Sequence, residues 1–269
     1  MSNASPTLPQ VRTVPTSAAL QWLALGWNDM RRTGWLSLAH GLVFVVCGAA
    51  IAAFAWQRFW LLAGALSGFL LIAPVLATGL YALSRALERR EPANFALILR
   101  TWLNWHKGRI NAWDADYWCM ARFGGLMALA ATGWVMTSAA LITLASPVPV
   151  TTPLDFVQHV VLAKNGWLFE FWLALGAMMA APVFASTAVT MQLLLDRRIP
   201  ILVAVMTSWQ AVLENPVALG LWAALIMALT LLGFATGLLG LIPLVPLLGH
   251  ASWHAYRALV DASAWPARD

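Results

Sequence analysis

Long apolar stretches make up most of the chain, and the polar residues are concentrated between them. A transmembrane helix needs about 20 mainly apolar residues. Stretches of this length cover residues 34–56, 59–84, 124–145 and 167–195, and a longer one covers 216–259. We divide the longest stretch near Gly237–Leu241, where clustered glycine and proline would loosen a helix. The pattern therefore predicts an all-α fold, a polytopic bundle of six transmembrane helices.

Composition supports a membrane protein and bears on its partners. The chain has 269 residues, of which 61% are hydrophobic and 10% are charged, whereas soluble domains carry about 25% charged residues. The 16 tryptophans fit this class, because tryptophan favours the membrane–water interface. The net charge of +5 indicates loops beside anionic lipid rather than a nucleic-acid partner, because the basic residues flank the apolar stretches. We expect the lipid bilayer and other membrane proteins as partners.

Lysine and arginine lie almost entirely on alternate sides of the six stretches. Of the 16, only Arg58 and Lys164 fall on the second side. Because cytoplasmic loops carry the excess of basic residues, we expect both termini to be cytoplasmic. Residues 1–17 are predicted to be a disordered cytoplasmic tail, residues 18–260 a single membrane domain, and residues 261–269 a second cytoplasmic tail.

Two of the stretches end alike, which suggests an internal repeat. Ala73–Arg90 and Ala181–Arg198 are identical at 7 of 18 aligned positions, and each ends in an acid and two arginines. The simplest account is three copies of one unit, residues 18–90, 93–198 and 200–260, each an interfacial helix followed by a transmembrane hairpin. The alternative is that short apolar segments with proline and arginine resemble one another by chance.

The segment before each hairpin has the pattern of an amphipathic interfacial helix. In residues 18–31 the apolar side comprises Leu20, Leu23, Trp27 and Met30, and the residues turned away from it comprise Asn28, Asp29 and Arg31. Residues 95–107 play the same part before the third stretch, with Leu99, Trp102 and Trp105 as the apolar side.

The repeat also selects candidate functional residues. It places Thr78, Ser186 and His250 at equivalent positions, four residues after a proline, and His254 lies one helical turn beyond His250. We expect a polar cluster in the cytoplasmic half of the membrane that comprises His40, Thr78, Tyr81, Arg85, Ser186, His250, His254, Tyr256 and Arg257.

The histidines admit more than one interpretation. Two histidines at i and i+4, such as His250 and His254, can bind one metal ion, and histidines on different helices can ligate a haem. The sequence favours a structural hydrogen-bonding role, because no acidic third ligand is nearby and no haem-attachment motif is present. We therefore predict no cofactor, with His250 and His254 as weak metal candidates.

The arginines that end two stretches also admit two interpretations. Arg85 follows Tyr81 at the end of the second stretch, and Arg257 follows Tyr256 at the end of the sixth. Long basic side chains at such positions commonly extend to the headgroups. The alternative is a cytoplasm-facing pocket for an anionic ligand or lipid headgroup.

Several segments of the chain are distinctive: RTVPTSAALQWLALGWNDM, APVLATGLYALSRALERREP, LLLDRRIP, TSWQAVLENP and PLLGHASWHAYRAL. They resemble a bacterial integral membrane family, domain of unknown function 2189 (DUF2189). The resemblance covers residues 12–260, and Gly249–Arg257 is its most specific part. It implies a bacterial inner-membrane protein and implies no activity.

Three functions remain open at this point. The sequence contains no Walker motif, nucleophile elbow or HExxH motif, so we expect no enzyme. This favours a non-enzymatic scaffold or accessory protein that binds membrane partners or lipid. The first alternative is a small-molecule or ion transporter with a cytoplasm-facing polar pocket, and the second is a metal- or haem-binding redox protein.

Overall fold

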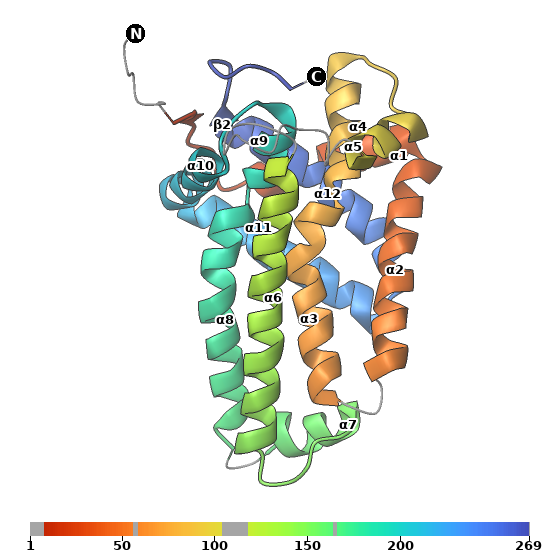
Figure 1. Cartoon of the computed structure of the whole chain (residues 1–269), viewed down its shortest axis with the longest axis vertical. Coiled ribbons are helices and arrows are strands. Elements are labelled where there is room, and N and C mark those ends of the chain that lie inside the picture. The colour runs from red at the N-terminus through yellow and green to blue at the C-terminus, as the bar shows by residue number, and fades with distance from the viewer. Residues whose placement is uncertain (1–7, 56–58, 104–117, 164–165, 269) are drawn as a thin grey trace. The chain divides into compact units, whose positions relative to one another are not determined.

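The protein is described by a computed structural model over residues 8–55, 59–103, 118–163 and 166–268 (Figure 1). The predicted all-α class is confirmed, since helices make up nearly all of the regular structure. Among the described residues, four helices are long and apolar enough to cross a membrane: Trp35–Ala55, Cys119–Ala145, Leu168–Asp196 and Pro216–Ala235. The chain divides into two compact units, which are described separately below.

Unit 1 comprises Met1–Val45, Pro74–Phe123 and Phe184–Asp269. Its helices are α1 (Ala18–Thr33), the first part of α2 (Trp35–Ala55), α4 (Thr78–Arg89), α5 (Phe95–Leu103), the start of α6 (Trp118–Ala145), α9 (Thr190–Asp196), α10 (Ile201–Glu214), α11 (Pro216–Ala235) and α12 (Leu241–Leu259). A short antiparallel pair, β1 (Gln10–Val11) and β2 (Val260–Asp261), completes it.

Helices α1 and α12, the first and last of the chain, pack closely against each other in unit 1. A Cβ atom at Gly26 would lie 2.6 Å from the backbone nitrogen of Ala251, so only glycine permits this separation. Beside this crossing, Trp22 of α1 and Trp222 of α11 meet edge to face, with ring centroids 5.7 Å apart. Small residues and buried tryptophans therefore hold α1 against the helices that end the chain.

Two helices that contain a proline end shortly after it, and a new helix follows each of them. Helix α3 (Phe59–Leu76) contains Pro74 and gives way to α4 at Ala77. Helix α8 (Leu168–Thr187) contains Pro182, and two residues separate its end from the start of α9. A proline ring clashes with the carbonyl four residues earlier and removes a hydrogen bond. Helix α12, by contrast, continues past Pro246 without a break.

Residues 8–17, part of the predicted tail of residues 1–17, are joined to the other end of the chain in unit 1, whereas residues 1–7 lie outside the described residues. Residues 8–17 are among those described, and β1 pairs with β2 while Arg12 lies 2.6 Å from the carboxylate of Asp261. The backbone of Val14 donates to the side chain of Asn215, the residue between α10 and α11. The segment is ordered because its polar backbone groups find partners at the far end of the chain.

Unit 2 comprises Val46–Ala73 and Gly124–Val183. It contains the second part of α2, most of α3, α6 and α8, and the short segments α7 (Pro153–Phe156) and η2 (Val157–Val161). Its buried apolar core comprises Ala55, Leu62, Ile142, Val150, Val160 and Leu168. Trp172 packs against Trp134 and donates a 2.8 Å hydrogen bond to the buried hydroxyl of Ser138. Apolar packing thus dominates this unit.

Candidate functional site: buried polar networks of unit 1

A buried chain of polar side chains, which we call the histidine network, links α1, α2, α4 and α12. At its centre, Nε2 of His250 lies 2.7 Å from the Ser37 hydroxyl and Nδ1 lies 2.7 Å from the Ser84 hydroxyl. Ser84 in turn donates to Asp29 over 2.7 Å. Nε2 of His254 lies 2.8 Å from the same carboxylate oxygen, and Thr33 bonds to Ser37.

The hydrogen bonds place a proton on Nδ1 of His250. Ser84 has one hydroxyl proton and gives it to Asp29, so its oxygen accepts from Nδ1–H of His250. On the Nε2 side, the single proton of Ser37 has two acceptors within reach, Nε2 of His250 and the hydroxyl of Thr33, which itself donates to the carbonyl of Asp29. The network thus contains a donor–acceptor chain from imidazole to hydroxyl to carboxylate.

Helical spacing brings the members of the histidine network together. Asp29 and Thr33 are four residues apart on α1, and His250 and His254 are four apart on α12, so each pair lies on one helix face. A Cβ atom at Gly249 would lie 2.5 Å from the side chain of Leu80, which is closer than van der Waals contact allows. This glycine therefore allows α4 to approach α12.

Asp29 is the acidic end of the histidine network. Its burial raises the pKa of the carboxyl, but the hydrogen bonds from His254 and Ser84 and the charges of both histidines lower it by more. The net pKa of Asp29 lies below its ordinary value of 3.8. The carboxylate is therefore ionised near neutral pH, although the residue is almost fully buried.

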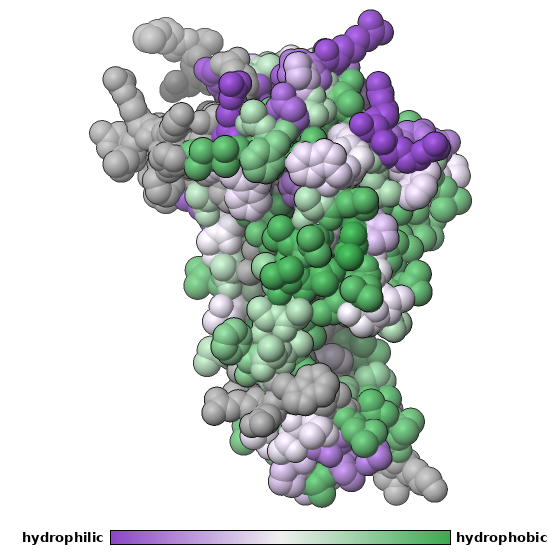
Figure 2. Space-filling model, turned by 90° about the vertical axis from the view of Figure 1, so that its right-hand side faces the viewer, coloured by the Kyte–Doolittle hydropathy of each residue, from purple (hydrophilic) through white to green (hydrophobic). Residues whose placement is uncertain are grey.

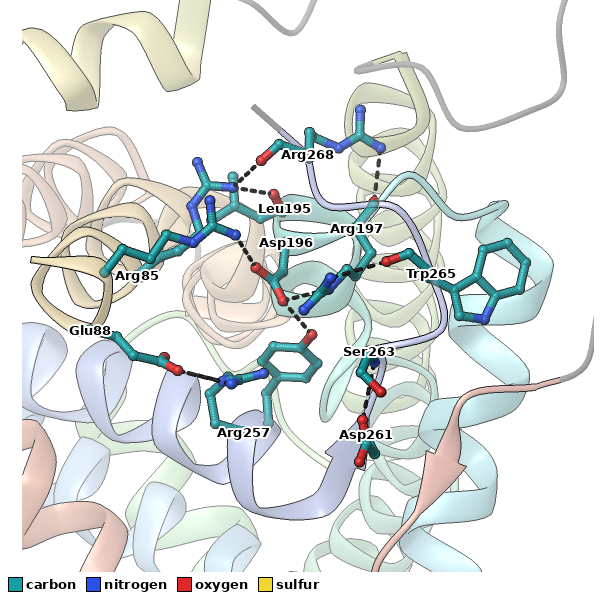
Figure 3. Close-up of polar contacts among 12 residues, drawn as sticks. Arg85, Glu88, Leu195, Asp196, Arg197, Arg257, Asp261, Ser263, Trp265 and Arg268 are labelled. Atoms are coloured by element: carbon teal, nitrogen blue, oxygen red, sulfur yellow. Dashed lines mark hydrogen bonds and ion pairs between the residues drawn. The ribbon is translucent and has the colours of Figure 1, made fainter. Parts of the chain in front are cut away.

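A second polar group, the aspartate network, surrounds Asp196 at the end of α9 (Figure 3). This carboxylate accepts from Arg89 at 2.9 Å, from Arg197 at 3.1 Å and from the hydroxyl of Tyr256 at 2.8 Å. Its side chain is only 4% exposed. Three donors thus satisfy one buried charge and link α4, α9 and α12.

The C-terminal segment closes over the aspartate network. Arg85 donates to the backbone carbonyls of Leu195 and Arg268, and the backbone nitrogen of Arg268 donates to the carbonyl of Asp196. Arg197 donates to the carbonyl of Trp265 over 3.0 Å (Figure 3). Residues 261–269, expected to be a tail, are thus fixed to α4 and α9 over their described part.

Glu88 of α4 aligns with Asp196 in the two similar sequence segments, and it also binds α12. Its carboxylate accepts from Arg257 at 2.9 Å and from the indole of Trp253 at 3.0 Å. Unlike Asp196, its side chain is 40% exposed. The acids that end the two similar segments therefore accept hydrogen bonds from successive turns of the same helix.

The candidate cluster of nine residues divides among several places within unit 1. His250 and His254 belong to the histidine network, and His40 lies beside it, hydrogen-bonded to the carbonyl of Leu36 and packed against Gly79. Arg85 and Tyr256 belong to the aspartate network, while Arg257 pairs with Glu88.

The three positions that the repeat makes equivalent do not share partners. Thr78 is buried and donates to the carbonyl of Val75 in the preceding turn. Ser186 accepts from the indole of Trp209 on α10, and His250 is held by two serines. Tyr81 is buried in α4. The positions that the predicted repeat aligns therefore make different contacts.

Sequence reasoning missed the acids that hold these networks together. Asp29 is turned away from the exposed Leu20 and Trp27, but the sequence did not indicate that this opposite side is buried. Arg31 is exposed and lies in helical spacing with Leu20 and Trp27, so the prediction that it turns away from them is wrong. The signal was the spacing of Trp22, Gly26 and Asp29, which lie within one face of α1. Small residues at that face indicate close helix contact better than apolar character does.

The chemistry of the two networks is that of hydrogen bonding and proton sharing. Both ring nitrogens of His250 already have hydroxyl partners. Asp29 lies beside His254, so an acidic residue is closer to the histidines than the sequence suggested. Over the described residues, no group of three or more histidine, cysteine, aspartate or glutamate side chains is arranged to hold a metal ion.

Comparison with known proteins gives one match. A family model described as a predicted integral membrane protein, DUF2189, matches residues 61–196, which is half of the chain. The match includes the first of the two similar segments, all but the last two residues of the second, and the acids Glu88 and Asp196, whereas α1 and α12 lie outside it. No curated protein and no solved structure matches the chain.

Proposed function

The chain belongs to the DUF2189 family of predicted integral membrane proteins, and on that premise we propose that it is a non-enzymatic scaffold or accessory protein. The observation that carries the proposal is that the candidate polar side chains bond to one another. His250, Asp29 and Asp196 are buried, and each accepts or donates bonds to other helices of unit 1. Such side chains stabilise one arrangement of helices, which is what a scaffold needs.

Exposed apolar stripes supply the surface for partners. Leu202, Met206, Trp209 and Leu213 of α10 are exposed at positions i, i+4, i+7 and i+11, so they form one stripe along the helix. On α5, Phe95, Leu99 and Leu103 are exposed at similar spacing. Broad apolar areas are also visible in Figure 2. Helices of this kind lie in the membrane interface, where they can contact lipid and membrane proteins.

The test is photo-crosslinking in native membranes. A photoreactive residue replaces Leu213, which is 72% exposed, and the control replaces Leu219, which is 1% exposed. We expect a defined protein adduct at position 213 and none at position 219, both identified by mass spectrometry. If position 213 labels only lipid and the chain is recovered alone, the scaffold proposal fails.

The proposed topology has six spans, with both termini cytoplasmic in a bacterial inner membrane. The proposal is supported by helices α2 and α6, which both begin in unit 1 and continue into unit 2, with α3 and α4 between them in the chain. It is also supported by the β1–β2 pairing, which joins the chain ends and fits an even number of crossings. Reporter fusions at both termini and within residues 146–152 test this proposal: the termini should report the cytoplasm and the loop the opposite side.

The threefold repeat and the single domain of residues 18–260 remain part of the proposal. The repeat is supported by α1, α5 and α10, each of which precedes a helical hairpin or a candidate span. It is also supported by Glu88 and Asp196, which both bind α12. In the third copy, α12 provides donors where the other copies provide acids.

A transporter is the second candidate, and the histidine network is the observation that favours it. A chain of hydroxyl, imidazole and carboxylate groups can pass a proton by successive hops, and ionisable groups within membrane proteins often mark proton paths. In liposomes with a pH-sensitive dye, wild-type protein would then carry protons, and the Ser84→Ala and His250→Gln variants would not. Equal leak in wild type, variants and empty liposomes would exclude this function.

A further inference from the structure

The exposed face of α1 carries two arginines and no exposed acid. Arg31, Arg32 and Asn28 are exposed and line an open cavity of about 510 Å³. The only acid of this helix, Asp29, is buried and bonded to His254 and Ser84. The positive charge of Arg31 and Arg32 is therefore not offset on the exposed side of their own helix.

Apolar side chains precede these arginines along the same face. Leu20, Trp27 and Arg31 are exposed and spaced by seven and four residues, so they form one stripe with the arginine at its end. Arg32 lies one residue further, next to Asn28 in helical spacing. An interfacial helix of this design places its apolar stripe among acyl chains and its arginines at the level of the headgroups.

Helix α10 provides an internal comparison. Its stripe of Leu202, Met206, Trp209 and Leu213 has the same spacing as that of α1. It ends, however, in Glu214, which accepts from Gln210, and it contains no basic residue. Both helices can contact acyl chains, but only α1 offers cations to a phosphate.

From this contrast we propose that Arg31, Arg32 and Asn28 form a binding site for the phosphate of an anionic phospholipid. The guanidinium groups bind the phosphate oxygens and the amide of Asn28 donates a further bond, while Leu20 and Trp27 contact the acyl chains. This inference rests on the proposed function. It assigns the lipid contact to anionic phospholipids and to the C-terminal end of α1.

The site has two properties that a general attraction to membranes lacks. It discriminates by headgroup charge, because two cations at a membrane surface each contribute about 1 kcal/mol toward anionic lipid. It also requires a lipid rather than a soluble phosphate, because the apolar stripe contributes only when acyl chains are present. Both properties can be measured on purified protein.

The experiment uses the full-length protein in detergent with phosphatidylglycerol or phosphatidylcholine of identical acyl chains, and bound lipid is counted by native mass spectrometry. The test variant is Arg31→Gln/Arg32→Gln. The control variant, Arg90→Gln/Arg100→Gln, removes the same charge from exposed positions at the end of α4 and in α5.

We expect wild type and control to prefer phosphatidylglycerol, and the Arg31→Gln/Arg32→Gln variant to bind it about thirtyfold more weakly. An unchanged thermal midpoint would confirm that the variant folds, since both side chains are exposed. Equal loss in the control variant, or displacement of the lipid by soluble glycerol phosphate at similar concentration, would overturn the proposal. If the protein retains the lipid but the crosslinking experiment finds no protein partner, the scaffold proposal fails and the lipid-site proposal stands.

Discussion

Units 1 and 2 are built from the same kind of helices but are stabilised in different ways. Unit 1 contains 14 of the 16 lysines and arginines of the chain, and its helices are joined by buried carboxylates, imidazoles and hydroxyls. Unit 2 contains only Arg58 and Lys164, and its described core is a cluster of aliphatic and aromatic side chains. Hydrogen-bond networks specify which helices meet, whereas apolar packing is more tolerant of substitution.

The strongest test of this comparison is removal of the buried acid of unit 1. Asp196→Ala leaves Arg89, Arg197 and Tyr256 without their shared acceptor, and breaking a buried ion pair from one side costs about 3–5 kcal/mol. We expect a large fall in the midpoint of thermal unfolding in detergent. Glu88→Ala is the matched control, because this partly exposed acid should cost only about 0–1 kcal/mol. Equal effects would mean that burial does not distinguish the two acids.

Asp29 gives a test that depends on pH. Its pKa in the folded protein is lower than the ordinary 3.8, so its ionised form stabilises the fold above that pH. This contribution is lost as the pH falls from 3.8 through the lowered pKa. We expect Asp29→Asn to cost about 1–3 kcal/mol at pH 7, with a difference from wild type that shrinks as the pH approaches 3.

The control for Asp29 is an acid of unit 2. Hydrogen bonds from Thr151 and Thr152 lower the pKa of Asp155 to about 2, but this residue is only partly buried. Asp155→Asn should therefore change the unfolding midpoint less than Asp29→Asn at every pH. A larger effect at Asp155 would contradict the view that buried polar contacts of unit 1 dominate.

Glycine substitutions test close helix contact in each unit. Gly26→Ala in α1 would force a Cβ atom to within 2.6 Å of the backbone of Ala251, so we expect a loss of about 1–3 kcal/mol. At Gly133 in α6 of unit 2, nothing lies within 4 Å of an added Cβ atom. Gly133→Ala should be neutral or stabilise by up to about 1 kcal/mol. Unfolding midpoints of the two variants would therefore move in opposite directions or by clearly different amounts.

The smallest effect is expected within the core of unit 2. Trp172→Phe removes the 2.8 Å hydrogen bond to Ser138 but keeps an aromatic ring against Trp134. Interhelical hydrogen bonds in membrane proteins are worth about 0.6 kcal/mol on average. The unfolding midpoint should fall only slightly, and a loss as large as that of Asp196→Ala would show that unit 2 also depends on polar contacts.

The sequence predicted the class of fold and the division of charge, because both follow from composition along the chain. The equivalence of the Arg-Arg ends of two segments stays a prediction, although the acids beside them both bind α12. The sequence did not indicate that the side of α1 opposite Leu20 and Trp27, which carries Asp29, is buried. A pattern of apolar residues identifies the lipid-facing side of an interfacial helix, and only small residues such as Gly26 reveal the protein-facing side.

The contacts of the candidate site could not be predicted, because they join residues that are far apart in the sequence. Ser84 meets His250 across 166 residues, and Tyr256 meets Asp196 across 60. No local spacing relates such pairs. From the sequence alone, a side chain could be assigned to a helix but not to its partner on another helix. The histidines were therefore grouped with Thr78 and Ser186, which bond elsewhere.

The pairing of the first helix with the last has a consequence for how the protein is made. Asp29 and His254 are separated by 225 residues, and ribosomes add about 5–20 residues per second. On that scale, Asp29 remains without its histidine partner for about 10–45 s of synthesis. A truncated chain that lacks α12 would expose this carboxylate and the glycine face of α1 permanently. The α1–α12 contact therefore forms only after α12 has been synthesised, and until then unit 1 lacks the partner of its buried acid.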